Sequence, residues 1–546
     1  MRAHDRRMTT SPASTDGATL PHAGGGPPFV LRVSALLPGA GGTHVPSRRA
    51  ALSGPFVPAA GCILLMLALA LFPARAAAQG ERDDFDRLGQ INKASIVMLA
   101  EAGLVPAPLA AAIAGGIGQV VEEQGEPGSR RSSDYLVFEE RLVEVVGRGA
   151  SRLHTGRSRQ DIGSTSRRLA LRAALLDTYE SLLAPRGALL ALAERHTRTI
   201  IPGYTHGVQA QPTSLAHYLL AFAAALERDA QRLEQAYGRV NRSPLGAAAL
   251  GTSGFPIDRE RLAALLGFGG VVENAYDANH VSSVDSKTEL ASALAISAIG
   301  VGQFSEDVQV QYHDPAPWLL LDRSLTGISS IMPQKRNPIA LERLRQVAST
   351  VLGDAQTVFL TAHNTSTGMI DYRGADQVLE TAEKARRMYA LYADVVAGLV
   401  VDPARSLAEV DADYATMTEV ADTLLRHAEV PFREGHHYAS ELTEYGRAHG
   451  KRPKELTAEE LLHVYEETYG EPLPVSVDRI REALDPEEMV AGRRGLGGPQ
   501  PAETERMLRE GRQRLDGGRR WLGGARGALQ EAETALEAAF TALAAP

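Results

Sequence analysis

Residues 329–338 bring several chemically useful side chains into one short stretch. The stretch is Ser-Ser-Ile-Met-Pro-Gln-Lys-Arg-Asn-Pro, so two hydroxyls lie close in sequence to a lysine, an arginine and an amide. Such a loop can offer cations and hydrogen-bond donors to a carboxylate, and a hydroxyl to a nearby proton. An ordinary basic turn before a helix has the same composition. On residue types alone that turn is the simpler interpretation, so the assignment depends on the rest of the chain.

Long helical segments are predicted around this loop. Apolar residues recur at helical spacing over residues 92–121 (broken once by Gly103 and Pro106), 167–196, 214–240, 287–312, 339–362 and 377–401. Most of these segments exceed twenty residues, and helices of that length favour a bundle. Strand signals are sparse and aromatic residues make up only 5% of the chain. We therefore predict an all-α fold with a central long-helix bundle and smaller helical N- and C-terminal domains.

The loops between these helices are rich in Gly, Pro and Ser, and they are the places where chemistry is expected. Three of them stand out, at residues 202–206, 243–246 and 326–330. A more polar region with shorter helical runs follows residue 413. The predicted organisation is a low-complexity head and export signal over 1–79, an N-terminal helical domain over 80–161, the bundle over 162–412 and a small helical domain over 413–546.

Composition excludes several classes of protein. Hydrophobic residues make up 44% and charged residues 23% of the 546 residues, which fits a large folded core. The formal net charge of -9 argues against a nucleic-acid binder, which normally carries a basic surplus. Cys62 is the only cysteine, so intramolecular disulfides are impossible and no zinc-type Cys/His spacing occurs. We predict no metal site.

The head of the chain has features of an export signal. Residues 62–72 form an unbroken apolar run, too short to span a bilayer as a helix, so no stable membrane span is expected. Ala-Arg-Ala and Ala-Ala-Ala follow at 74–78 and fit a cleavage site, and Ser-Arg-Arg at 47–49 resembles the start of a twin-arginine signal. The protein is predicted to be exported, to the periplasm or beyond, if this signal functions, and cytoplasmic otherwise.

Residues 329–338 resemble the signature of the fumarase/aspartase superfamily, in the form found in its argininosuccinate lyase branch. Residues 154–161, His-Thr-Gly-Arg-Ser-Arg-Gln-Asp, resemble that branch's His-Thr-x-x-Ser-Arg-Asn-Asp motif. Gly-Tyr-Thr-His at 203–206 and Ala-Gln-Pro at 210–212 resemble a second motif. Weaker matches lie at 244–246, 255–259, 431–434 and 495–498. The resemblance covers the chain from about residue 92 to its end.

The resemblance implies a carbon–nitrogen lyase that expels an amine, arginine or a related one, from an N-substituted aspartate by anti elimination and leaves fumarate. Ser329 is the implied catalytic base, with Lys335 as the cation that helps its hydroxyl to ionise. His206 is the candidate acid for the leaving nitrogen, and Glu342 is the carboxylate that orients it. The implied substrate-binding residues are Ser158, Arg159, Gln160, Thr205, Asn337, Tyr372 and Gln377.

The family likeness also implies a homotetramer with active sites shared between subunits, a small dicarboxylate or amino-acid substrate and no cofactor. Several positions depart from the family pattern. Its N-terminal Ser-Ile-x-x-Asp element is missing, its asparagine is Gln160, its carboxylate-binding lysine is Glu380, and only Asp285 survives from an acidic-basic-acidic triplet. Two alternatives stay open: a lyase for a different amine–fumarate adduct, and a catalytically silent structural or binding relative.

Overall fold

The computed structural model describes residues 83–125, 129, 131–368 and 376–545. The chain divides into two units, residues 1–78 and 79–546, and all described residues belong to the second unit. The predicted export signal lies outside the described residues. No helix among the described residues combines the length and the apolar character needed to cross a membrane.

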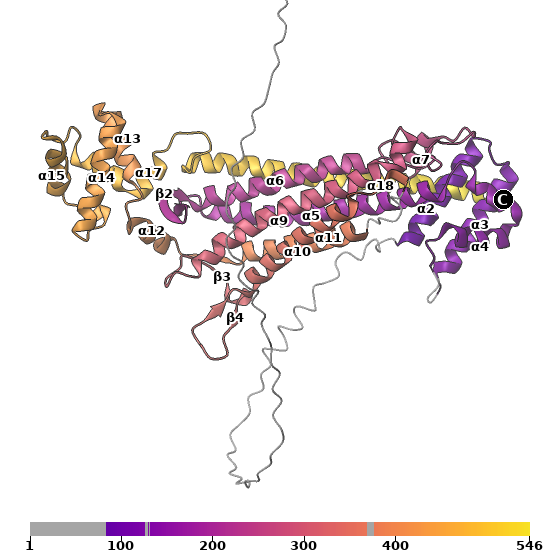
Figure 1. Ribbon diagram of the computed structural model, residues 1–546, viewed down its shortest axis with the longest axis horizontal. Helices are drawn as coiled ribbons and strands as arrows, with labels where there is room; N and C mark the ends of the chain where they lie inside the picture. The colour runs from indigo at the N-terminus through magenta and orange to yellow at the C-terminus, as the bar shows by residue number, and fades with distance from the viewer. Residues whose placement is uncertain (1–82, 126–128, 130, 369–375, 546) are drawn as a thin grey trace, which may run out of the picture. The chain divides into compact units, whose positions relative to one another are not determined.

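Five long helices lie side by side and form the central bundle (Figure 1). They are α5 (Arg159–Arg195), α6 (Leu215–Val240), α9 (Ser282–Gln311), α10 (Ile339–Ala362) and α11 (Asp376–Ala397). Their apolar faces meet in one large core that includes Leu175, Leu219, Leu290 and Val351, each less than 2% exposed. The all-α prediction is confirmed, because only short strands accompany these helices.

A second core joins the N-terminal helices to the start of the bundle. Its helices are α2 (Asp84–Glu101), α3 (Ala107–Gly125), α4 (Tyr135–Val146), the 3-10 helix η1 (Arg148–His154) and α7 (Arg259–Leu265). The break between α2 and α3 contains Gly103, which has a positive φ, and Pro106, as the sequence predicted. This core surrounds the start of α5, so it supports the residues just before that helix.

The C-terminal helices form a third core with members such as Val420, Tyr438 and Ile480. They are α12 (Pro403–Asp411), α13 (Met417–Ala428), α14 (Phe432–Ala448), η4 (Pro453–Glu455), α15 (Ala458–Tyr469), α16 (Val477–Leu484) and α17 (Pro486–Ala491). Nothing in the structure decides the domain boundaries that the sequence suggested, and they stay a prediction.

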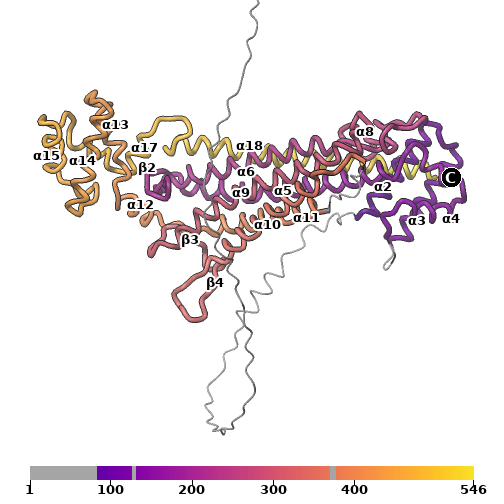
Figure 2. Tube along the Cα trace, viewed as in Figure 1, coloured from indigo at the N-terminus to yellow at the C-terminus, as the bar shows by residue number. Residues whose placement is uncertain are grey.

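The last helix, α18 (Pro501–Ala544), differs from the short helical runs expected after residue 413. It is 44 residues long and packs along α5 and α6 until it reaches α2 and α3 (Figure 2). Its glycines weaken the helical signal in the sequence. They also permit close packing, since a Cβ at Gly518 would lie 2.6 Å from the Tyr179 hydroxyl.

Three two-stranded antiparallel sheets connect the helices. β1 (Ile200–Thr205) pairs with β2 (Val208–Ser214), β3 (Leu319–Leu321) with β6 (Leu399–Val401), and β4 (Gly327–Ile328) with β5 (Arg336–Asn337). The 3-10 turn η2 (Arg323–Leu325) links β3 to β4, and the short helix α8 (Ala275–His280) precedes α9. Two of these hairpins carry predicted site residues.

Candidate active site

Ser158 is the N-cap of α5, and its neighbours Arg159 and Gln160 form the first turn. The Ser158 hydroxyl accepts from the Gln160 backbone N–H at 3.2 Å, and the Asp161 carboxylate accepts from the Ser158 N–H at 2.6 Å, which completes a capping box. The positive end of a 37-residue helix therefore lies beneath these side chains, and it favours a bound carboxylate.

Asp161 fixes the loop that faces this helix start. Its second oxygen accepts from the backbone N–H groups of Gly246 at 2.9 Å and Ala248 at 3.1 Å. The carboxyl is fully buried, and burial raises its pKa although these N–H donors oppose the shift. Asp161, the last residue of the motif at 154–161, therefore has a structural role. Its hydrogen bond to Gly246 gives the weaker match at 244–246 a structural role as well.

His280, which was not among the predicted site residues, lies beside Gln160. The imidazole is 4% exposed, and its Nδ1 lies 2.7 Å from the Thr367 carbonyl oxygen and 3.4 Å from Gln160 Nε2. The preceding residue, Asn279, donates to the Ala249 carbonyl at 2.7 Å. No motif marks His280, so only its place in the fold reveals it.

Gln377 lies in the first turn of α11. Gln377 is half-buried, and its carbonyl accepts from the Thr381 hydroxyl one turn later. Tyr372 lies outside the described residues. The predicted site residues Ser158, Arg159 and Gln160 therefore lie together at the start of α5, and Gln377 lies at the start of α11.

Thr205 and His206 lie at the tip of the β1–β2 hairpin. Thr205 pairs with Val208, so His206 and Gly207 form a two-residue turn, and both have positive φ angles of 54° and 75°. Both predicted site residues are exposed in the single chain. The turn therefore presents the imidazole outward from its own subunit.

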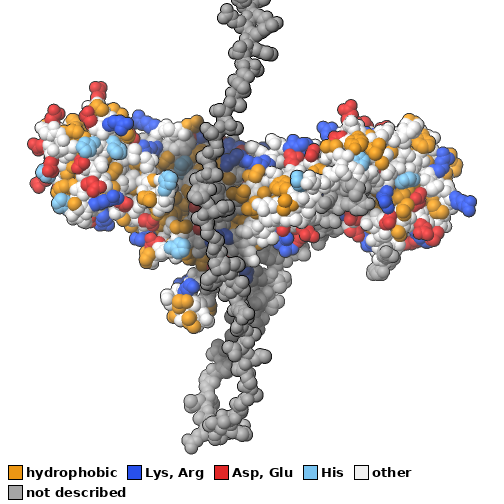
Figure 3. All heavy atoms as spheres, in the orientation of Figure 1, with side chains coloured by type: hydrophobic (Ala, Val, Ile, Leu, Met, Phe, Trp, Pro, Cys, Tyr) orange, Lys and Arg blue, Asp and Glu red, His pale blue; other side chains and the backbone are white. Residues whose placement is uncertain are grey.

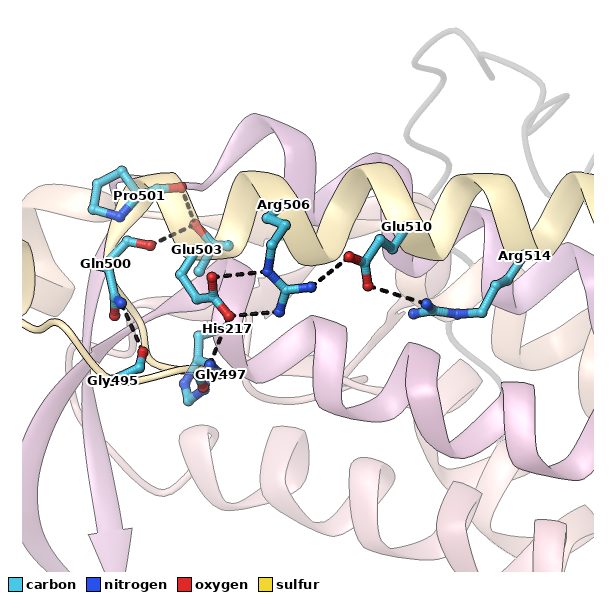
Figure 4. Close-up of polar contacts among 10 residues, drawn as sticks. His217, Gly495, Gly497, Gln500, Pro501, Glu503, Arg506, Glu510 and Arg514 are labelled. Carbon is cyan, nitrogen blue, oxygen red and sulfur yellow. Dashed lines mark hydrogen bonds and ion pairs between the residues drawn. The ribbon is translucent and has the colours of Figure 1, made fainter.

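The base of this hairpin is held by elements from the C-terminal part of the chain. The Ser406 hydroxyl of α12 donates to the Ile200 carbonyl at 2.6 Å, and Tyr204 donates to Glu409. At the other strand, the loop before α18 is fastened to the start of α6: His217 Nε2 donates to the Gly497 carbonyl at 2.9 Å (Figure 4). A row of ion pairs then continues along α18 through Glu503, Arg506, Glu510 and Arg514.

Ser329, Lys335 and Asn337 lie on the β4–β5 hairpin. Gly327 pairs with Asn337 and Ile328 with Arg336, so the next pair in the same register is Ser329 with Lys335. The Ser329 hydroxyl oxygen accepts from the Met332 backbone N–H at 3.2 Å. Ser329 and Lys335 thus flank the loop 330–334, one at the end of each strand.

The hairpin is placed directly before α10. A Cβ at Gly327 would lie 2.1 Å from Ile339 Cδ1, so β4 rests tightly on the first turn of that helix and needs glycine there. Glu342 also lies in this first turn and is exposed. The Ser329 loop therefore adjoins the N-terminus of a 24-residue helix, where anionic groups are stabilised.

The three sets of residues do not meet within one chain. Ser158 and the β1–β2 hairpin lie at opposite ends of α5, and 37 helical residues span about 55 Å. Figure 2 shows β2 and α8 at the two ends of the bundle, with the β4 hairpin projecting between them. In the described residues, no hydrogen bond or ion pair joins Ser329, His206 and Gln160 to one another.

Glu380, which stands where the family has a lysine, is exposed on α11. The nearest candidate replacement on that helix, Lys384, already binds Asp354 at 2.6 Å, and this hydrogen bond raises the lysine's pKa. The other candidate, Arg373, lies outside the described residues. The described part of α11 therefore offers no free cation beside Glu380 in the place of the family lysine.

Comparison with known proteins gives consistent matches. A family model described as Lyase matches residues 77–353, and one described as argininosuccinate lyase C-terminal matches residues 414–491. Argininosuccinate lyase 2 of Agrobacterium fabrum is 35% identical over 76% of this chain and 84% of its own length. Argininosuccinate lyase of Methanosarcina acetivorans is 34% identical over 78% of this chain and 86% of its own. The crystal structure of EDDS lyase in complex with formate is similar at a TM-score of 0.76 and 31% identity, over 84% of this chain and 92% of that one.

Proposed function

Because this chain belongs to the argininosuccinate lyase family of the fumarase/aspartase superfamily, we propose that its active site is built from the three residue sets described above. The chain is a carbon–nitrogen lyase that releases fumarate from an N-substituted aspartate. In the proposed anti elimination, one group removes the proton beside a carboxylate while another protonates the departing nitrogen.

Ser329 is the proposed base. The observation that carries this assignment is the register of the β4–β5 hairpin, which sets Ser329 opposite Lys335, together with the Met332 N–H that points at the Ser329 oxygen at 3.2 Å. A lysine ammonium and a backbone N–H both stabilise an alkoxide. After proton removal, negative charge moves onto the adjoining carboxylate, and Lys335 and Asn337 are the proposed ligands for that charge.

His206 is the proposed acid on the amine side, and Glu342 is proposed to orient it. Both side chains are exposed in the single chain and come from elements at different places in the bundle. We propose that they cooperate across an interface between subunits. Thr205, Ser158, Arg159 and Gln160 are the proposed carboxylate ligands, with Tyr372 and Gln377 as further substrate-binding residues.

The separation of the three sets supports a homotetramer with shared sites. Apolar side chains that a single chain leaves exposed are consistent with this assembly: Ile296 and Ile299 on α9, and Leu360 on α10, are 42%, 51% and 74% exposed. Ile328 and Ile331 on the β4–β5 hairpin are even more exposed than these three side chains. Figure 3 shows hydrophobic and basic side chains together on this projecting hairpin. A neighbouring subunit would cover both surfaces.

For the leaving amine, we propose a group other than arginine. Argininosuccinate carries a carboxylate on its arginine half, and Glu380 replaces the lysine that the family places near it. Lys384 is engaged by Asp354 and does not compensate. An amine portion without that carboxylate, or with a second positive charge, suits Glu380 better.

The test is fumarate release, followed by ultraviolet absorbance, from a panel of N-substituted aspartates that includes argininosuccinate and ethylenediamine adducts. We expect a higher kcat/KM for an adduct whose amine part lacks a carboxylate. A highest value for argininosuccinate would overturn the substrate proposal and leave the lyase chemistry in place. Failure to release fumarate from any adduct would favour the catalytically silent alternative.

A further inference from the structure

We propose that His280 is a positioning residue that holds the side-chain amide of Gln160 with its NH2 group toward the substrate. His280 belongs to α8, outside every motif that led to the site. Its ring is 4% exposed and rests against Tyr276, with ring centroids 4.9 Å apart. The inference rests on the proposed function, since it requires Gln160 to bind substrate.

The protonation of His280 follows from its strongest contact. Nδ1 lies 2.7 Å from the Thr367 carbonyl oxygen, and a carbonyl only accepts hydrogen bonds, so Nδ1 carries a proton. The Tyr276 hydroxyl lies 2.8 Å from the Thr367 hydroxyl, which fixes the same residue from a second side. Thr367 is therefore held by two side chains of one short helix.

This protonated Nδ1 decides the orientation of the Gln160 amide. The amide lies 3.4 Å from Nδ1, and its NH2 group cannot donate to a nitrogen that already bears a proton. The two ends of an amide have nearly the same shape, and with the oxygen toward Nδ1 the single Nδ1–H can be shared between the Thr367 carbonyl and the Gln160 oxygen. The NH2 group then points away from His280, where it can donate to a carboxylate above the start of α5.

The other ring nitrogen is consistent with a positioning role. Nε2 is buried and has no hydrogen-bond partner among the described residues, so it makes no competing contact that fixes the ring in another way. The family asparagine at position 160 has a shorter side chain. The longer glutamine needs an additional constraint to hold its amide, and His280 supplies it.

Two substitutions of equal polarity test this idea. In His280→Asn the amide nitrogen takes the place of Nδ1–H, while in His280→Gln the longer side chain moves its amide toward the place of Nε2. We expect His280→Asn to keep kcat/KM within about threefold of the native value, and His280→Gln to lose about tenfold, mainly through KM. Melting temperature and oligomeric state of each variant are the controls for folding.

The decisive comparison repeats both substitutions in a Gln160→Ala background. If His280 acts through Gln160, the difference between the two variants disappears there, because the group that it positions is gone. A difference that persists, or equal activity of the two variants in the native background, overturns the proposal. Tyr276→Phe is a milder probe, because it leaves the buried ring of His280 in place. We expect this variant to raise KM about threefold, and we expect no such rise in the Gln160→Ala background.

Direct binding separates this inference from the proposed function. Fumarate affinity, measured by calorimetry, should fall about tenfold in His280→Gln and stay unchanged in His280→Asn, whether or not a substrate has been found. Absence of turnover on every adduct would contradict the proposed function alone. Equal fumarate affinity in the two variants, or no fumarate binding by the native protein, would contradict the role of His280.

Discussion

Among single residues, the proposed elimination depends most on Ser329. Ser329 directly follows β4, Lys335 directly precedes β5, and the Ser329 hydroxyl accepts the Met332 backbone N–H. A nearby cation and an N–H donor both stabilise a negative oxygen. We expect Ser329→Ala to lower kcat by ~10³-fold or more, because general base catalysis is lost. Fumarate binding and the assembled state should be unchanged. A variant that retains near-native turnover would remove Ser329 from the mechanism.

Glu380 makes the second prediction at this scale. Glu380→Lys restores the charge that the family places near the amine-side carboxylate. We expect kcat/KM for argininosuccinate to rise about two- to fivefold, since an exposed ion pair is worth ~0.2–1 kcal/mol. Glu383→Lys, one turn along the same exposed helix, is the matched control. An equal rise in both variants, or none in Glu380→Lys, would show that this position does not select the substrate.

At the scale of elements, the anchorage of α18 has a predictable pH dependence. Glu503 binds Arg506 and accepts from the Gly497 N–H, which lower the pKa of its carboxyl from 4.5 to about 2. A lowered pKa in the folded state contributes stability above the ordinary pKa, and this contribution is lost as pH falls toward about 2.

We therefore expect Glu503→Gln to lower the melting temperature at about pH 7 and to have a clearly smaller effect at about pH 3, where part of the contribution has been lost. Arg514→Gln, farther along the row of ion pairs, is a control for general charge loss. The same destabilisation at both pH values would mean that packing rather than the charge of Glu503 fastens this loop.

The elements also show what the sequence could and could not predict. Helical spacing located the bundle, and the break at Gly103 and Pro106 was visible because both residues interrupt helices locally. The length of α18 was missed because its glycines serve tertiary packing. His280 and Asp161 act through contacts with residues 85 or more positions away, which no local pattern encodes. The separation of the site residues likewise required the observed length of α5.

At the scale of the whole molecule, the head of the chain makes a prediction about location. The family match begins at residue 77, next to the predicted cleavage sites. We propose export, with a mature chain that begins near Ala77 or Gln79. N-terminal sequencing of protein from the native host checks this. Recovery of a cytoplasmic chain that still carries residues 62–72 would contradict it.

The central claim is that one active site takes its parts from several copies of the chain. Two variants that each lack one proposed catalytic group, Ser329→Ala and His206→Ala, test it most directly when they are unfolded together and reassembled as mixed oligomers. If Ser329 and His206 of one site come from different subunits, random mixing restores both native groups in about a quarter of the sites. We therefore expect fumarate release at about a quarter of the native rate, against almost none for either variant reassembled alone. Mixed oligomers as inactive as their parents would contradict this shared site.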